Sequence, residues 1–166
     1  MKSKKIKKQS HQNSADPVYQ VKIKVFGVGG GGGNAISRMK DTLSARTVAL
    51  IAVNTDSQDL EKCEVKKHVH IGKNLTHGLG TGMNPELGRQ AAEENRSEIV
   101  ESVKGADLVF ITAGLGGGTG SGASAVVAEV AKESGALTIA IVTKPFSFEG
   151  VQRSKIATEA LSKLKE

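Results

Sequence analysis

Apolar and polar residues alternate near the start of the chain, where Val21, Ile23 and Val25 are separated by lysines. A period of two is typical of a β-strand. Strands that are covered on both faces are instead continuously apolar, as at 48–53, and 108–112 is predicted to be another buried strand. The next strand is expected at 137–142. A shorter strand is predicted from about residue 66 to residue 71.

Four stretches with the helical spacing of apolar residues lie between these strands and after the last one. Asn34 is expected to cap the first helix, whereas Asn84 and Pro85 form the start of the second, which should end near Val103. Gly135 should end the third helix. The predicted apolar stripes are Ile36, Met39 and Leu43 in the first helix, Ala123, Val126, Val127, Val130 and Ala131 in the third, and Ile156, Ala160, Leu161 and Leu164 in the last.

Alternation of strands and helices predicts an α/β fold with right-handed crossovers. We expect an open, doubly wound, mostly parallel sheet of the Rossmann-like kind, with helices on both faces and three layers in all. The last predicted helix runs from about Gly150 to the end of the chain. We expect its apolar stripe to remain unpaired and to make the surface sticky.

Charge divides the chain unevenly. Of a net charge of +6, five lysines fall within the first eight residues, which leaves the remainder nearly neutral. We therefore predict a disordered basic tail at 1–20 and one folded domain at 21–166. The tail could attract nucleic acid or anionic lipid, but its polar composition favours a solvated arm. Aromatic residues are only 3% of the chain, which argues against a nucleic-acid partner.

Other features of the composition indicate a cytoplasmic protein. The chain has 166 residues, the length of one domain, and no apolar run approaches the ~18 residues of a membrane span, so direct membrane insertion is not expected. The single cysteine, Cys63, cannot form an internal disulfide and is expected to be buried and inert. His68 and His70 share a strand face, but two ligands without a third rarely form a metal site, so none is predicted.

Two glycine-rich loops each follow a strand and precede a helix. The first spans 27–33 and contains the spacing G-x-G-x-x-G at Gly27, Gly29 and Gly32, which alone is weak evidence for a dinucleotide. The second spans 116–122. In a doubly wound sheet their strands are neighbours, so both loops should face one ligand and cradle a triphosphate. The hydroxyls of Thr119 and Ser121 would add hydrogen bonds.

The phosphate charge would have to be neutralised without a P-loop lysine, because G-x-x-x-x-G-K-[ST] is absent from the sequence. A bound Mg²⁺ is expected to take that part. Asn54 and Asp56 end the second predicted strand. Asp56 could hold ribose in a dinucleotide enzyme, orient water or Mg²⁺ at a triphosphate, or simply cap the next helix.

Five strings of the sequence resemble the FtsZ family of bacterial tubulin-like GTPases. They lie at 27–35, 52–56, 78–86, 112–120 and 143–150, the fourth being the signature Gly-Gly-Gly-Thr-Gly. The resemblance covers about 21–166. It implies a site for GTP or GDP with Mg²⁺, formed by Gly30, Gly31, Gly32, Gly33, Asn34, Asn54, Asp56, Gly80, Gly82, Gly116, Gly117, Gly118, Thr119, Gly120, Ser121, Glu149 and Arg153.

Within this set the resemblance gives individual roles. Gly80 and Gly82 belong to the loop that senses the γ-phosphate, Glu149 resembles the acid that binds ribose, and Arg153 the basic residue beside the nucleotide. A plain surface ion pair between Glu149 and Arg153 is the alternative.

The resemblance also implies a cytoskeletal GTPase that polymerises head to tail into the bacterial division ring at mid-cell, with membrane-anchor proteins as partners. In the family a central helix contacts guanine and a later loop supplies the catalytic acid, and neither is present here, so no catalytic residue is assigned within the chain. A nicotinamide-dependent dehydrogenase using Gly27, Gly29, Gly32 and Asp56, and a nucleotide-binding fragment without turnover, remain alternatives.

Overall fold

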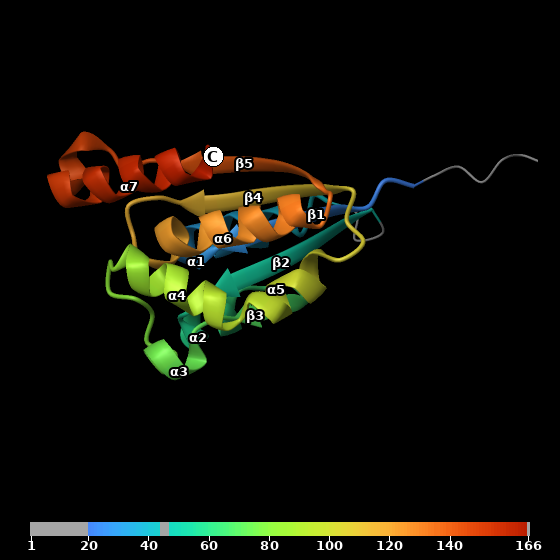
Figure 1. Cartoon of the computed structure of the whole chain (residues 1–166), viewed down its shortest axis with the longest axis horizontal. Helices are drawn as coiled ribbons and strands as arrows, with labels where there is room; N and C mark the ends of the chain where they lie inside the picture. Colours follow the sequence, from blue (N-terminus) through green and yellow to red (C-terminus); the bar gives the residue numbers. More distant parts are fainter. Residues whose placement is uncertain (1–19, 44–46, 166) are drawn as a thin grey trace, which may run out of the picture.

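The computed structural model describes residues 20–43 and 47–165, so the predicted basic tail lies outside the described residues except for Gln20. Five parallel strands form one sheet in the order β3-β2-β1-β4-β5 (Figure 1). The strands are β1 (Ile23–Val28), β2 (Val48–Asn54), β3 (Lys67–His70), β4 (Leu108–Gly114) and β5 (Leu137–Thr143). The predicted α/β class, parallel sheet and neighbouring positions of β1 and β4 are confirmed.

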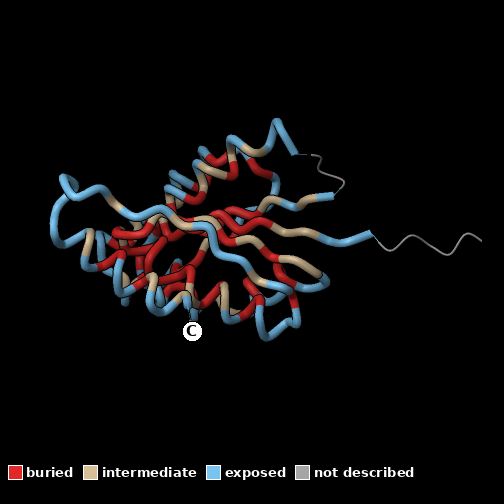
Figure 2. The backbone as a smooth tube through the Cα atoms, turned by 90° about the horizontal axis from the view of Figure 1, so that it is seen from above, coloured by how far each residue is buried: buried red, intermediate tan, exposed pale blue. Residues whose placement is uncertain are grey.

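Helices cover both faces of the sheet and complete three layers, as Figures 1 and 2 show from two directions. On one face lie α1 (Gly29–Met39) and α2 (Ser57–Lys62). The other face carries α4 (Pro85–Glu94), α5 (Arg96–Val103), α6 (Thr119–Glu133) and α7 (Val151–Leu164). Two short helices, α3 (Lys73–Thr76) and the 3-10 helix η1 (Ser147–Glu149), lie in the connections.

Each side of the sheet has its own apolar core. Beneath α4–α7, the larger core includes Phe26, Ile51, Ile99, Ile111 and Val127, all fully buried. The smaller core lies beneath α1 and α2 and includes Val25, Ile36, Leu60 and Cys63. Because β1, β2 and β4 are central, their side chains enter both cores, which explains the largely apolar sequences of β2 and β4.

The predicted second helix is in fact two helices, α4 and α5, and the break lies at Asn95. The start of α4 is as predicted, with Asn84 accepting the Leu87 N–H at 3.1 Å and a proline in the first turn. Asn95 accepts the Gly72 N–H at 2.8 Å through its side chain. This bond fixes the loop after β3 to the break between the two helices.

The start of α1 differs from the prediction. Asn34 was expected to cap this helix, but the helix begins at Gly29, and Asn34 is a residue of its interior. Glycine has poor helix propensity, so propensity does not predict a helix start at Gly29. Packing accounts for it: a Cβ on Gly27 would lie 2.5 Å from the Gly32 carbonyl oxygen, so only glycines let α1 lie this close to β1. Leu43, predicted on the stripe, lies beyond the helix and is exposed.

The prediction of an unpaired apolar stripe on the last helix is wrong. On α7, Ile156 and Ala160 are buried, and Leu161 and Leu164 pack against the larger core. Exposed apolar side chains occur instead on the edge strand β5. Leu137, Ile139 and Ile141 form this β5 face, and the exposed fractions of Leu137 and Ile141 are 66% and 62%.

Candidate functional site

A pocket of about 480 Å³ lies at the carboxyl ends of the strands, between the segments that follow β1, β2, β4 and β5. This is the edge at which open α/β sheets bind ligands, where the order of connections reverses between β1 and β4. A pocket of this size is ordinary for a small-molecule site. Residues of both glycine loops line this one pocket.

Two helices begin at this pocket, and neither has a side-chain cap. The N-cap of α1 is Val28 and that of α6 is Gly118, and neither makes a side-chain hydrogen bond to the helix start. The first N–H groups of a helix lack partners within it and carry about half a positive charge. Gly30 and Gly31 of α1, with Thr119 of α6, line the pocket. Two such helix starts side by side make a strong anion site.

The two helix starts can meet only because the residues between them are glycines. A Cβ on Gly29 would lie 2.9 Å from the Gly120 amide nitrogen, and Gly29 has φ of +70°. A Cβ on Gly120 would lie 2.5 Å from the Gly114 carbonyl oxygen. A side chain at either position would disturb this close packing of the two helix starts. The glycines of the second loop are therefore needed for packing, and they also leave room for a ligand.

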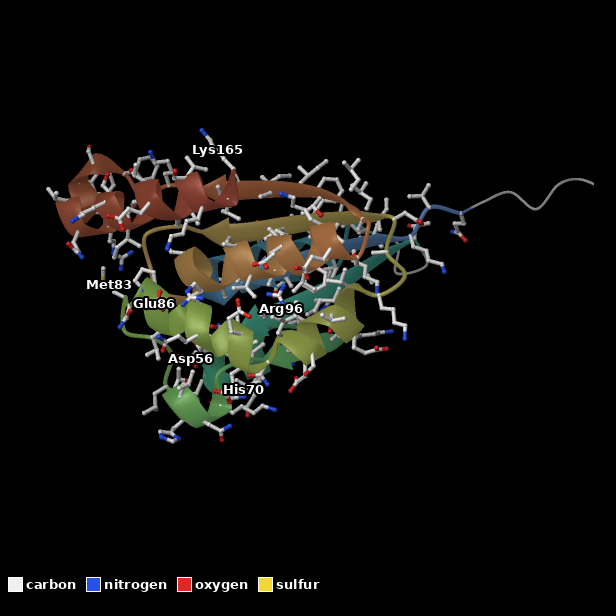
Figure 3. The ribbon with its side chains drawn as sticks, in the orientation of Figure 1. Asp56, His70, Met83, Glu86, Arg96 and Lys165 are labelled. Carbon is white, nitrogen blue, oxygen red and sulfur yellow. The ribbon has the colours of Figure 1, made fainter. Side chains whose placement is uncertain are left out.

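A third segment, 78–84, closes the pocket from the side of α4. Gly80, Thr81 and Gly82 line it, and both glycines have positive φ, +76° and +53°. The segment is tied to β2 and α2, because the Ser57 N–H donates to the Gly78 carbonyl at 3.1 Å. Figure 3 shows Met83 of this segment and Asp56 at the same end of the molecule.

Asp56 both caps a helix and lines the pocket. One carboxylate oxygen accepts the N–H groups of Gln58 and Asp59, at 2.9 and 3.1 Å, so the capping interpretation holds for that oxygen. The other carboxylate oxygen of Asp56 lies beside Gly80, 3.7 Å from the position that a Cβ on Gly80 would take. Asp59 lines the same pocket, and its carboxylate lies 3.0 Å from the Cβ position of Gly30.

These carboxylates fit a magnesium ion that is also bound by phosphate. Mg²⁺ typically takes one or two carboxylates and completes its shell with waters and phosphate oxygens. Across 20–43 and 47–165 there is no group of three or more His, Cys, Asp or Glu side chains that could hold a metal by themselves. Asp56 and Asp59 would thus hold the ion only together with a bound phosphate.

The opposite wall of the pocket comes from the segment after β5. Thr143, Lys144, Glu149 and Arg153 line it. Glu149 accepts the Phe146 N–H at 2.8 Å with one oxygen, and its other oxygen lies 3.5 Å from an Arg153 guanidinium nitrogen. The predicted alternative, an ion pair between positions 149 and 153, is therefore present, and both side chains still face the pocket.

Twelve of the predicted site residues line this pocket. Gly33 and Asn34 line a neighbouring pocket of about 80 Å³ that shares Gly30 and Asn54 with the first. The remaining three predicted residues, Gly32, Gly116 and Ser121, lie outside both pockets and hold the surrounding backbone in place. Gly32 packs against β4, and the buried Ser121 hydroxyl oxygen accepts the Gly116 N–H at 2.9 Å.

Sequence reasoning did not single out Asp59, Thr81 and Lys144 as site residues, although all three line the pocket. Lys144 lies within a string that carried the family resemblance, and Asp59 lies three residues after Asp56, the acid assigned to the site. Thr81 stands between the two predicted glycines, where its side chain gave no separate signal.

Residues outside the pocket behave as structural groups. Cys63 is buried, as expected, with its sulfur 3.2 Å from the Ser37 hydroxyl. His68 donates to the Cys63 carbonyl oxygen at 3.0 Å. No helix of 20–43 and 47–165 is long and apolar enough to cross a bilayer.

The chain matches the model of the Tubulin/FtsZ family GTPase domain over residues 22–166. Among solved structures it is similar to the empty FtsZ dimer of M. jannaschii, with 48% sequence identity and a TM-score of 0.85. That match covers 89% of this chain and 43% of the FtsZ chain, so this chain spans less than half of that relative.

Two further structures from Haloferax volcanii have 29% identity to this chain and cover 87% of it. They are the GDP-bound monomer of CetZ1, with a TM-score of 0.78 over 48% of its own length, and the GTPγS-bound protofilament of CetZ2, with 0.75 over 46%.

Proposed function

The chain belongs to the Tubulin/FtsZ family, and from this premise we propose that it binds GTP and GDP in the pocket between α1 and α6. One observation carries the proposal: two uncapped helix starts converge on one pocket through contacts that only glycine permits. A single dinucleotide pyrophosphate needs one such helix start, whereas a triphosphate can use both. The dehydrogenase alternative leaves the second helix start without a role.

Within this site we assign Gly30, Gly31 and 117–120 to the phosphates. Asp56 and Asp59 would hold Mg²⁺ against a phosphate oxygen, and Glu149 would hold the ribose. Magnesium supplies charge neutralisation, in place of the lysine of other nucleotide-binding loops. These roles are proposals, and the lining positions of the side chains support them.

A titration of the purified chain with a fluorescent GTP analogue, followed by displacement with GTP, GDP, ATP and NADH, tests the binding proposal. We expect saturable binding that GTP and GDP displace and that NADH does not. Displacement by NADH at a concentration where GTP is inert would favour the dehydrogenase alternative. Binding should weaken when EDTA removes the divalent ion, because the phosphate charge then lies beside two unneutralised carboxylates.

We further propose that hydrolysis and filament formation need a second subunit, as in the division ring formed by FtsZ proteins at mid-cell, where membrane-anchor proteins would be partners. Exposed apolar side chains beside the pocket support a contact there. The exposed fraction of Leu79 is 81% and that of Phe148 is 84%, and Phe148 stacks on Phe146 with ring centroids 5.4 Å apart. Large exposed apolar groups of this kind mark interaction surfaces.

Addition of this chain to a polymerising FtsZ tests the assembly proposal. A chain that presents the pocket face should cap filament ends and lower the polymer mass in sedimentation. Phe148→Glu should abolish that effect while Val100→Glu, which alters an exposed apolar residue on α5, should not. Equal effects of the two variants would contradict the proposed contact.

A further inference from the structure

Three threonine hydroxyls from separate segments meet at the wall of the pocket. Thr55 follows β2, Thr81 lies in 78–84, and Thr119 is the first residue of α6. The Thr119 hydroxyl oxygen is 2.6 Å from that of Thr55 and 3.2 Å from that of Thr81. Their exposed fractions are 0%, 7% and 9%, so solvent has little access to these groups.

The hydrogen-bonding capacity of Thr119 determines the direction of this network. A hydroxyl has one proton to donate and two lone pairs with which to accept. Thr119 lines the pocket, so a bound phosphate oxygen can accept its proton. When that happens, the two remaining bonds of Thr119 are filled only if Thr55 and Thr81 both donate to it. Donation from both neighbours also polarises the Thr119 hydroxyl and strengthens its bond to the anion.

Backbone packing holds Thr81 against the phosphate-binding loop. A Cβ on Gly118 would overlap the Thr81 hydroxyl oxygen and would lie 2.9 Å from the Asn84 nitrogen. A Cβ on Gly88 would lie 2.5 Å from the Gly118 carbonyl oxygen. The segment 78–84, the start of α4 and the start of α6 are thus in direct contact, and a shift of one must displace the others.

We propose that Thr81 is a positioning residue, which donates to Thr119 so that the Thr119 proton points at a phosphate of the bound nucleoside triphosphate. This inference rests on the proposed function. It also gives 78–84 a direct link to the bound phosphate: a bond to the ligand fixes the Thr119 hydroxyl, which in turn fixes Thr81. Nucleotide binding should therefore stabilise this segment.

The test uses the whole chain and the fluorescent GTP analogue. Thr81→Val and Thr81→Ala both remove the hydroxyl, and the alanine variant cannot crowd Gly118. Each should raise the Kd by about 3- to 10-fold, the usual effect of one lost hydrogen bond. Thr81→Ser keeps the hydroxyl and should restore affinity to within about twofold. Hydrogen exchange should show that nucleotide protects the amides of 80–84 in the wild type and in Thr81→Ser only.

Thr76→Val is the matched control. Thr76 is as buried as Thr81, but its hydroxyl oxygen lies 3.2 and 3.0 Å from the backbone carbonyl oxygens of Thr55 and Gly72, which share its single proton, and it does not bond to Thr119. Its loss should leave the Kd unchanged. The inference is overturned if Thr76→Val loses as much affinity as Thr81→Ala does. It is also overturned if Thr81→Val and Thr81→Ala both bind the analogue as tightly as the wild type. Absence of saturable binding by the wild type would overturn the proposed function itself, and the inference with it.

Discussion

Gly32 lies directly against the carbonyl oxygen of Thr112, so that a Cβ at position 32 would overlap that oxygen. The contact joins the interior of α1 to β4 and sets how closely the helix approaches the sheet. It explains why the glycine run is longer than a phosphate loop requires. Part of the run serves the ligand, and part serves the packing of α1.

Replacement of Gly32 by alanine should therefore destabilise the fold. Overpacking of a tight interior costs about 1–3 kcal/mol of unfolding free energy, and Gly32→Ala should reach this range in thermal or urea unfolding. Gly33→Ala is the matched control, because its Cβ would lie 3.8 Å from the Cys63 sulfur, at ordinary contact distance. In the helix interior that change should be neutral or stabilise by up to ~1 kcal/mol. Equal unfolding free energies for the two variants would contradict this account.

Gly117 offers a clean test of the phosphate pocket. A Cβ on Gly117 meets no atom within 4 Å, and its φ is not positive, so Gly117→Val adds bulk at the pocket wall without strain. GTP-analogue affinity should fall at least about tenfold, with melting temperature unchanged, because the valine occupies space that the phosphates need. Gly118→Val is expected to lower stability as well, since its side chain would overlap Thr81. Undiminished binding by Gly117→Val would show that the phosphates lie elsewhere.

The sequence allowed the parallel sheet and the meeting of the two glycine loops to be predicted for one physical reason. A parallel strand buried on both faces must be continuously apolar, and the positions of Ile51 and Ile111 in such runs identify β2 and β4 as central. Once the strands are placed, the doubly wound connection brings the loops after β1 and β4 together.

What the sequence did not reveal depends on contacts between distant segments. Asn34 carries a good capping side chain, but the helix start is set by the contact of Gly27 with Gly32, which no propensity describes. The apolar spacing of α7 predicts which face of the helix is apolar, but it does not show what that face packs against. In the structure Ile156, on this face, is buried. The bond between Thr81 and Thr119 joins positions 38 residues apart, so only the fold brings it about.

The β5 face should govern the solubility of this chain. Leu137 and Ile141 are exposed on an edge strand, and such a surface promotes association. A Leu137→Thr, Ile141→Thr double variant should bind less of a hydrophobic dye and sediment with less aggregate, while the unfolding free energy changes by no more than about 0.5 kcal/mol. Ile156→Thr, on the stripe of α7 that was expected to be exposed, should instead destabilise the fold. If Ile156→Thr reduced aggregation and the β5 double variant did not, the surface that causes association would lie on α7 and not on β5.

Glu149 provides the sharpest test of where the sugar lies. Its carboxylate lines the pocket while one oxygen accepts the Phe146 N–H and the other faces Arg153. If it also accepts a ribose hydroxyl, Glu149→Gln weakens a charge-assisted hydrogen bond, and the Kd for GTP should rise about 10- to 100-fold. The Kd for 2′,3′-dideoxy-GTP should change little, because that ligand lacks the hydroxyls. Arg153→Met controls for the ion pair, which at 3.5 Å between half-exposed groups contributes under about 1 kcal/mol. Equal losses for GTP and dideoxy-GTP in Glu149→Gln would mean that Glu149 only shapes the loop after β5, and the ribose would have to be assigned to another wall of the pocket.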